Sequence, residues 1–279
     1  MRYCIIALSL LIVISLCVPS SNSGLLSGFR QPVLAGADTA LLHPNFDLTF
    51  PRLNELIPEL SFSAERKAQR FLSLANGILA LSPDFFRLVD KTHPLEPEYE
   101  PRDLKTLSPD DFHVSKDSMR LDTHAYSALL TMTKAAARRG VALKIASAYR
   151  SYDDQKKLFD FYVKREGRET AMRFSAPAGS SQHQLGTAVD FGDVSHGFSR
   201  THAWSWLAAN ARIYGWSLSY PDNAEEVTGY IGESWHWRWI GIDAAMMQFE
   251  FFDDSQQRFL EFWNRYGDVL AASRLLPGR

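Results

Sequence analysis

The sequence predicts an α+β fold, with a small and mainly antiparallel sheet flanked by helices. Three observations support this prediction. The chain has 279 residues and is 46% hydrophobic, which is enough for one sizeable core. The expected strands are short, and they are interspersed with helices without the regular βαβ repetition of a parallel sheet. The sequence also contains no internal repeat and no low-complexity block.

The first 23 residues have the pattern of a secretory signal peptide. Arg2 precedes an apolar run of about 15 residues, from Cys4 to Val18, and residues 21–23 (SNS) offer a cleavage site. The alternatives are an uncleaved anchor and a lipoprotein signal with Cys17 as the lipidated residue. Both cysteines of the chain lie in this segment, so the mature protein would have no disulfide and no Cys–metal site. We therefore expect an exported protein of the periplasm or cell envelope, with any membrane attachment only through the N-terminus.

Residues 24–90 are expected to form an N-terminal arm with one helix. Helical periodicity extends over residues 63–75, with Ser63 as the N-cap and Gly77 beyond the end of the helix. Residues 91–113 are rich in Pro, Asp and His, which is typical of a surface loop.

The regular core begins near residue 122, where Asp122 and Gly140 delimit a helix. Alternating apolar residues then predict half-buried strands, and a capping box at Ser151 predicts a second helix. In chain order, the expected helices cover residues 123–139, 151–164, 201–214 and 253–272, the strands cover residues 141–145, 187–191, 216–220 and 235–240, and a loop covers residues 175–182. We expect the main domain to span residues 91–245, followed by a helical extension over residues 246–279.

The charge balance argues against nucleic acid as a partner. Lys and Arg total 30, Asp and Glu total 32, and the net charge is −2. The sequence has no basic stripe and no long run of like charges.

Two sequence blocks carry residues suited to metal chemistry, SQHQLGTAVD at 181–190 and ESWH at 233–236. They supply the imidazoles of His183 and His236 and the carboxylate of Asp190. Zinc accepts such ligands, and three of them leave a fourth position for water, whose pKa zinc lowers to about 7. Glu233 is the candidate that would take a proton from this water and later donate it to the leaving group.

Strand geometry sets a condition on this site. Residues three apart on a regular strand face opposite sides, so Glu233 and His236 share a site only if the chain turns between them. The same parity problem separates His183 from Asp190, where Gly186 is the expected break. A single histidine is more often a hydrogen-bonded structural residue than a ligand, so the hypothesis depends on the joint pattern.

Three blocks resemble the signature blocks of the VanY-type D-alanyl-D-alanine carboxypeptidases. These enzymes are zinc peptidases of the group that includes lysostaphin and the hedgehog signalling domain. The blocks are SAYRSYDDQ at 147–155, SQHQLGTAVDFG at 181–192 and TGYIGESWHWRWIG at 228–241. The lead-in HPLEPEYEPRDL at 93–104 is also similar, so the resemblance covers residues 90 to 241 or thereabouts.

The resemblance implies a zinc peptidase domain with the hedgehog/D-Ala-D-Ala-peptidase-like fold. It implies one Zn²⁺ per chain, held by His183, Asp190 and His236, with Glu233 as the general base. It also implies that Arg150 faces the substrate, and the donor fork of a guanidinium suits a carboxylate or an oxyanion.

Two further residues, Ser181 and Gln155, match motif positions that are expected to line the substrate pocket. Three residues depart from the family pattern. Ala178 and Ser234 stand where proline is usual, and Ser219 stands where a basic residue is expected, which bears on substrate preference.

The implied activity is a D,D-carboxypeptidase that removes the terminal D-alanine from peptidoglycan stem peptides. An L,D-carboxypeptidase or an endopeptidase of peptidoglycan would use the same ligands. The alternative from another class is a non-catalytic, wall-binding domain that keeps the zinc fold.

Overall fold

The computed structural model describes residues 43–275. The predicted signal peptide at residues 1–23 and the beginning of the predicted arm lie outside the described residues. Within residues 43–275, no helix combines the length and apolar character that are needed to cross a membrane.

The centre of the fold is a five-stranded sheet with the strand order β2-β4-β5-β7-β6. The pair β2–β4 is parallel, and the pairs β4–β5, β5–β7 and β7–β6 are antiparallel. The predicted α+β class with a small, mainly antiparallel sheet is therefore confirmed. The strands are β2 His113–Val114, β4 Lys144–Ser147, β5 Ala188–Phe191, β6 Trp216–Leu218 and β7 His236–Trp239.

The region predicted as a loop over residues 91–113 contains two short strands. β2 begins at the last residue of this region, His113. β1 (Leu104–Thr106) lies inside the region and pairs with β3 (Arg120–Asp122) in a separate two-stranded sheet. The loop prediction was wrong at these points because strands of two or three residues are too short to show a period of two.

The helices around the sheet begin at the caps that the sequence indicates. The side chain of Asp122 accepts hydrogen bonds from the backbone of α3 (Thr123–Ala137), and Ser151 accepts one from Asp154 at the start of α4 (Tyr152–Glu166). The predicted helix at 201–214 is α6 (His202–Asn210) followed by a 3₁₀ turn, η4 (Ala211–Tyr214). Two short helices were not predicted, α5 Arg168–Phe174, which packs beside α4, and α7 Glu225–Thr228.

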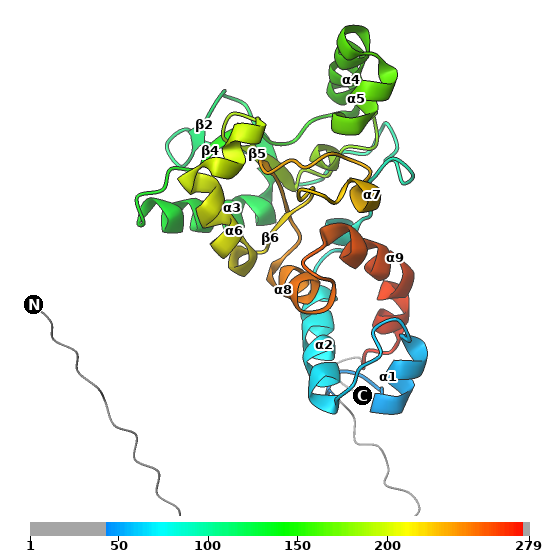
Figure 1. Ribbon diagram of the computed structural model, residues 1–279. Helices are drawn as coiled ribbons and strands as arrows, with labels where there is room; N and C mark the ends of the chain where they lie inside the picture. The colour runs from blue at the N-terminus through cyan, green and yellow to red at the C-terminus, as the bar shows by residue number, and fades with distance from the viewer. Residues whose placement is uncertain (1–42, 276–279) are drawn as a thin grey trace, which may run out of the picture. The chain divides into compact units, whose positions relative to one another are not determined.

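Helices from the two ends of the described region pack together beside the sheet (Figure 1). The predicted N-terminal helix is α2, the predicted C-terminal helix is α9, and neither α1 nor α8 was predicted as a separate helix. The expected N-cap Ser63 was wrong, because α2 begins after Ala64 and has no side-chain cap. Gly77 lies inside α2 rather than beyond its end. A Cβ added at Gly77 would lie 1.8 Å from Asp243 Oδ2, so the absence of a side chain there makes room for α8. The elements are α1 Phe50–Leu56, α2 Glu65–Ile78, η1 Pro83–Phe86, α8 Ile242–Phe251 and α9 Gln256–Ala272.

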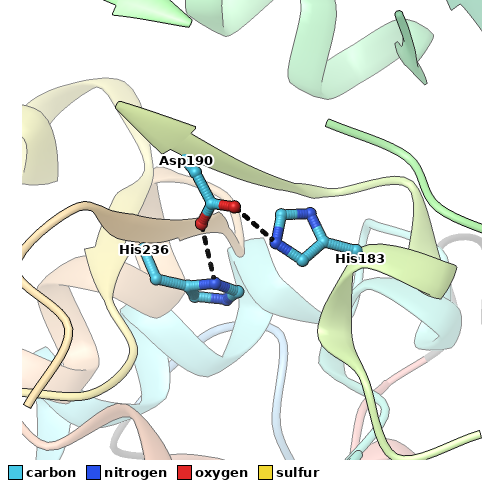
Figure 2. Close-up of side chains that lie close together, drawn as sticks. All are labelled: His183, Asp190 and His236. Carbon is cyan, nitrogen blue, oxygen red and sulfur yellow. Dashed lines mark ion pairs between the residues drawn. The ribbon is translucent and has the colours of Figure 1, made fainter. Parts of the chain in front are cut away.

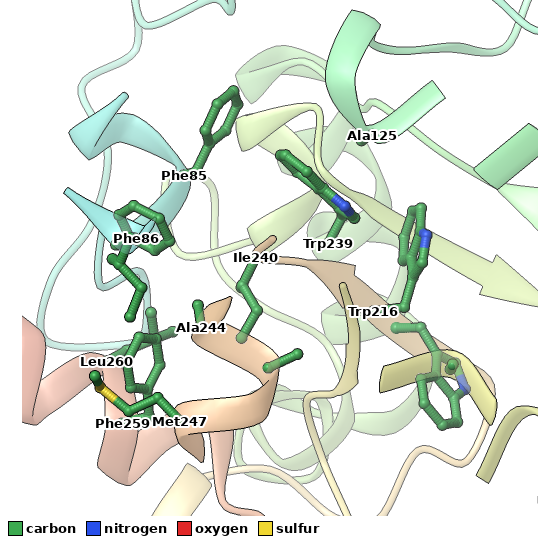
Figure 3. Close-up of a cluster of buried hydrophobic side chains, with 14 of the residues drawn as sticks. Phe85, Phe86, Ala125, Trp216, Trp239, Ile240, Ala244, Met247, Phe259 and Leu260 are labelled. Carbon is green, nitrogen blue, oxygen red and sulfur yellow. The ribbon is translucent and has the colours of Figure 1, made fainter. Parts of the chain in front are cut away.

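One hydrophobic core joins these terminal helices to the sheet (Figure 3). The ring of Phe85 on η1 meets the ring of Trp239 on β7 edge to face, with centroids 5.0 Å apart. Phe259 of α9 and Met247 of α8 are fully buried in the same cluster. Burial of each such side chain contributes about 1.5–3 kcal/mol, so the terminal helices stabilise the sheet that carries the site.

Candidate metal centre and active-site cleft

The side chains of the three predicted metal ligands lie close together, and they come from neighbouring elements (Figure 2). Asp190 of β5 and His236 of β7 are direct partners in the antiparallel ladder, so their side chains leave the same face of the sheet. His183 comes from η2 (Gln182–Leu185), the 3₁₀ turn before β5. One ligand atom from each residue lies within 4.8 Å of the other two. The sequence separations of 7 and 46 positions are thus closed by sheet pairing and one turn.

Both parity problems are solved by local turns. Gly186 adopts a left-handed conformation with a φ of 69°, which ends η2 and lets His183 face Asp190. Near the second block, the backbone N–H of His236 donates to the carbonyl of Glu233 across 3.1 Å. The chain therefore turns between Glu233 and His236 before β7 begins.

Hydrogen bonds orient the two imidazoles. Nδ1 of His183 lies 2.7 Å from the carbonyl of Ala148, which can only accept, so Nε2 of His183 faces Asp190 Oδ2 at 3.2 Å without a proton. Nε2 of His236 lies 3.2 Å from the side-chain oxygen of Gln182, and Nδ1 of His236 faces Asp190 Oδ1 at 3.1 Å. Each ring thus turns one lone pair towards the same point, as metal-binding histidines do.

The electrostatics fit a zinc ion. Burial lowers the pKa of His183 to about 4, so its imidazole is neutral at pH 7, the form that binds metal. Burial raises the pKa of Asp190, but attraction to the protonated forms of His183 and His236 outweighs burial and holds the pKa of Asp190 well below its usual range. Asp190 Oδ1 is buried without a well-aligned hydrogen-bond donor, despite its short distance to His236. Two imidazole nitrogens and a carboxylate with such an unpaired oxygen are the donor set that zinc accepts.

Glu233 lies beside these donors. Its Oε2 atom is 3.8 Å from Nδ1 of His236, and its side chain is buried. Burial raises the pKa of Glu233 well above its usual value, the charge of Asp190 raises it further, and Arg150 opposes both. A divalent cation at this point would favour the ionised carboxylate.

Arg150 is held at the wall of the same site. Its Nη1 donates to Gln155 across 2.8 Å and its Nη2 donates to Ser147 across 2.9 Å. Nη2 also lies 3.9 Å from Asp190, and the Arg150 side chain remains 21% exposed. The guanidinium is therefore fixed in orientation and still accessible.

The two predicted pocket residues have different surroundings. The amide of Gln155 is buried, and both of its ends are occupied, by Arg150 and by the carbonyl of Ala176 at 2.6 Å. The hydroxyl of Ser181 accepts from the backbone of His183 at 3.3 Å. Both residues line the cleft, and both support neighbouring site residues.

The cleft has a volume of about 970 Å³ and contains all the predicted site residues. Sequence reasoning missed the aromatic residues Tyr220 and Tyr230, which line it beside Glu233. It also missed Gln182, whose contact with His236 depends on a fold that adjacency to His183 alone does not reveal.

Comparisons with known proteins find a matching family model and a similar curated protein. Residues 118–242 match the family model described as VanY: D-alanyl-D-alanine carboxypeptidase. The putative carboxypeptidase YodJ of Bacillus subtilis (strain 168) is 38% identical over 195 residues, which are 66% of this chain and 71% of the relative.

Two solved structures share the fold. The LdcB LD-carboxypeptidase is 34% identical with a TM-score of 0.59, over 64% of this chain and 87% of that one. The D,D-pentapeptidase VanY from a VanB-type resistance cassette is 28% identical with a TM-score of 0.54, over 63% of this chain and 99% of that one. This second relative was solved in complex with Zn(II). The predicted fold class, zinc cofactor and peptidase class agree with these findings, and the chain belongs to the VanY family of D-alanyl-D-alanine carboxypeptidases.

Proposed function

We propose that this protein is a zinc-dependent D,D-carboxypeptidase that removes the terminal D-alanine from peptidoglycan stem peptides. The observation that carries the proposal is the convergence of His183, Asp190 and His236 in an open cleft that also holds Glu233 and Arg150. Family membership supports the reaction, and the donor set supports the metal.

The chemistry requires a metal, a proton carrier and a site for negative charge. Zinc held by His183, Asp190 and His236 would supply a Lewis acid and lower the pKa of a bound water. Glu233, whose Oε2 lies 3.8 Å from Nδ1 of His236, would take the proton of the attacking water and pass it to the nitrogen of the departing D-alanine. Arg150 binds the substrate carboxylate or the developing oxyanion, because Gln155 and Ser147 fix its donors beside the cleft.

A second specificity uses the same residues. The resemblance to the LdcB LD-carboxypeptidase, at 34% identity, favours an L,D-carboxypeptidase that shortens tetrapeptide stems as the alternative. The two activities differ in the bond cleaved and not in the metal or the base.

Digestion of defined stem peptides tests the proposal. Pentapeptide, tetrapeptide and tripeptide stems are incubated with the purified protein, with and without a chelator, and the products are identified by mass spectrometry. The proposal predicts chelator-sensitive conversion of the pentapeptide to the tetrapeptide. Conversion of only the tetrapeptide to the tripeptide would favour the L,D alternative. Stoichiometric zinc without release from any stem would favour a wall-binding domain.

The proposed substrate lies outside the cytoplasmic membrane, so export is part of the proposal. The signal-peptide pattern of residues 1–23 supports a location in the periplasm or cell envelope. Fractionation of cells and the N-terminal mass of the mature protein test this step. A full-length chain in the cytosol would contradict it.

A further inference from the structure

A buried path of side-chain amides connects the metal centre to helix α9. Nε2 of His236 lies 3.2 Å from the oxygen of Gln182, and the amide nitrogen of Gln182 donates to the oxygen of Gln256 across 3.0 Å. The amide nitrogen of Gln256 donates to the backbone carbonyl of Ser217 across 3.4 Å. All three side chains are buried, so water does not compete for these bonds. Gln256 lies beyond the residues 118–242 that match the family model.

The order of donors and acceptors along this path is fixed at the end farthest from His236, where the carbonyl of Ser217 lies. The carbonyl of Ser217 can only accept, so Gln256 turns its amide nitrogen towards it and its oxygen towards Gln182. That oxygen also only accepts, so Gln182 presents its nitrogen to Gln256 and its oxygen to the metal centre.

The orientation of Gln182 influences the tautomer of His236. An amide oxygen facing Nε2 favours a proton on Nε2 and a lone pair on Nδ1, whereas the carboxylate of Asp190, which faces Nδ1, favours the opposite tautomer. The orientation of Gln182 therefore works against Asp190 in keeping Nδ1 free for a metal ion. With the amide reversed, Nε2 would have to accept, and the proton would move to Nδ1. A proton on Nδ1 competes with a metal ion for the same lone pair.

Ser219 contacts both amides of the path. Its hydroxyl lies 2.7 Å from the oxygen of Gln182 and 3.2 Å from the oxygen of Gln256, and because a hydroxyl can donate or accept, it fits this orientation without selecting it. Ser219 is buried and is absent from the residues that line the cleft, so the expected effect of this position on substrate preference has no direct contact to support it.

We infer that Gln256 is a positioning residue for the metal centre: through Gln182 it holds His236 in the tautomer that presents Nδ1 to zinc. The inference rests on the proposed role of His236 as a ligand. It assigns to the C-terminal helix a role in metal binding in addition to its role in the core.

Zinc affinity tests the inference without any assay of hydrolysis. Gln256→Leu keeps the approximate volume and removes the acceptor, and we expect it to weaken zinc binding about 10- to 100-fold in competition with a chelator. The matched control is Gln248→Leu. Gln248 is also buried and bonds Ser217 Oγ at 2.6 Å and the carbonyl of Asp254 at 2.9 Å, but it does not contact Gln182. We expect the control to lose thermal stability and to keep the wild-type zinc affinity.

The tautomer is the second readout. In the metal-free protein, ¹⁵N NMR should find a larger share of the Nε2-protonated tautomer of His236 in the wild type and in Gln248→Leu than in Gln256→Leu. If Gln256→Leu does not fold, Gln182→Leu interrupts the same path and should weaken zinc binding in the same way.

Two results would overturn the inference: wild-type zinc affinity in Gln256→Leu, or an equal loss of affinity in Gln248→Leu. His236→Ala distinguishes this failure from failure of the proposed function. If His236→Ala loses zinc while Gln256→Leu keeps it, the inference is wrong and the metal site stands. If His236→Ala also keeps wild-type affinity, the proposed metal site itself is wrong.

Discussion

Gln155 holds the guanidinium of Arg150 from the buried side of the cleft. Its oxygen accepts from Arg150 at 2.8 Å, and its nitrogen donates to the carbonyl of Ala176 at 2.6 Å. The amide thus links α4 to the loop before η2, and one of its two partners is the guanidinium that we propose to bind substrate. The orientation of Arg150 therefore depends on a residue that substrate need not touch.

Replacement of Gln155 by Leu should lower kcat/KM about 10- to 100-fold, because a hydrogen bond to a charged group contributes about 1.5–3 kcal/mol. Zinc affinity should remain at the wild-type value, since Gln155 contacts none of the three proposed ligands. Steady-state kinetics on a stem peptide and chelator competition measure the two effects. A loss of zinc together with activity would contradict a role limited to Arg150.

Replacement of Glu233 by Gln should lower kcat by a factor of about 10² to 10⁴, because an amide cannot carry the proton. The variant should still bind one zinc ion, because the three ligands are unchanged. Glu225→Gln is the control, since Glu225 pairs with Arg173 on the surface and does not line the cleft. Unchanged turnover in Glu233→Gln would exclude the role of Glu233 as the base.

The site was more predictable than the packing around it. His183, Asp190, His236 and Glu233 lie in two sequence blocks, and the residue types indicate metal chemistry before any fold is known. Side chains alternate between the two faces of a strand, so turns near Gly186 and after Glu233 were needed for these residues to share one site. The structure brings these residues together, and their chemical roles remain predictions for the variants above.

The missed elements depend on tertiary contacts. The side chain of Gln256 meets Gln182, 74 positions earlier, and no local pattern encodes that contact. Helix α8 escaped prediction because it has apolar residues on most sides, which obscures a helical stripe. Gly77 resembles a helix end in sequence, whereas its missing side chain makes room for α8.

Asp90 should make stability depend on pH in acid. Burial alone would raise the pKa of Asp90, but hydrogen bonds from Thr92, Gln257 and His93 outweigh it and lower the pKa to about 2 from the usual 3.8. The folded state therefore favours the carboxylate, and this contributes about 2 kcal/mol to the free energy of unfolding above pH 4. This contribution to stability is lost as the pH falls from 3.8 towards 2, because in this range the unfolded chain binds the proton while Asp90 in the folded protein stays ionised.

Asp90→Asn should accordingly be less stable than the wild type at pH 7, and the difference should narrow at pH 3. Urea unfolding of both proteins at the two pH values measures it. A chelator in every sample removes zinc from both proteins, so the difference between them reports Asp90. A difference that stays constant with pH would show that the charge of Asp90 is not involved.

Two glycines with the same left-handed backbone conformation allow the cost of backbone strain to be measured apart from the cost of steric overlap. Gly140 and Gly215 have φ values of 73° and 82°, so alanine at either position carries the left-handed cost of about 1–2 kcal/mol. A Cβ at Gly140 would meet nothing within 4 Å, whereas a Cβ at Gly215 would lie 2.7 Å from the carbonyl carbon of Gly241. Backbone there cannot move without disturbing the end of β7, and overpacking adds about 1–3 kcal/mol. Urea unfolding should therefore find Gly215→Ala less stable than Gly140→Ala by that further amount, and equal losses would show that the contact relaxes freely.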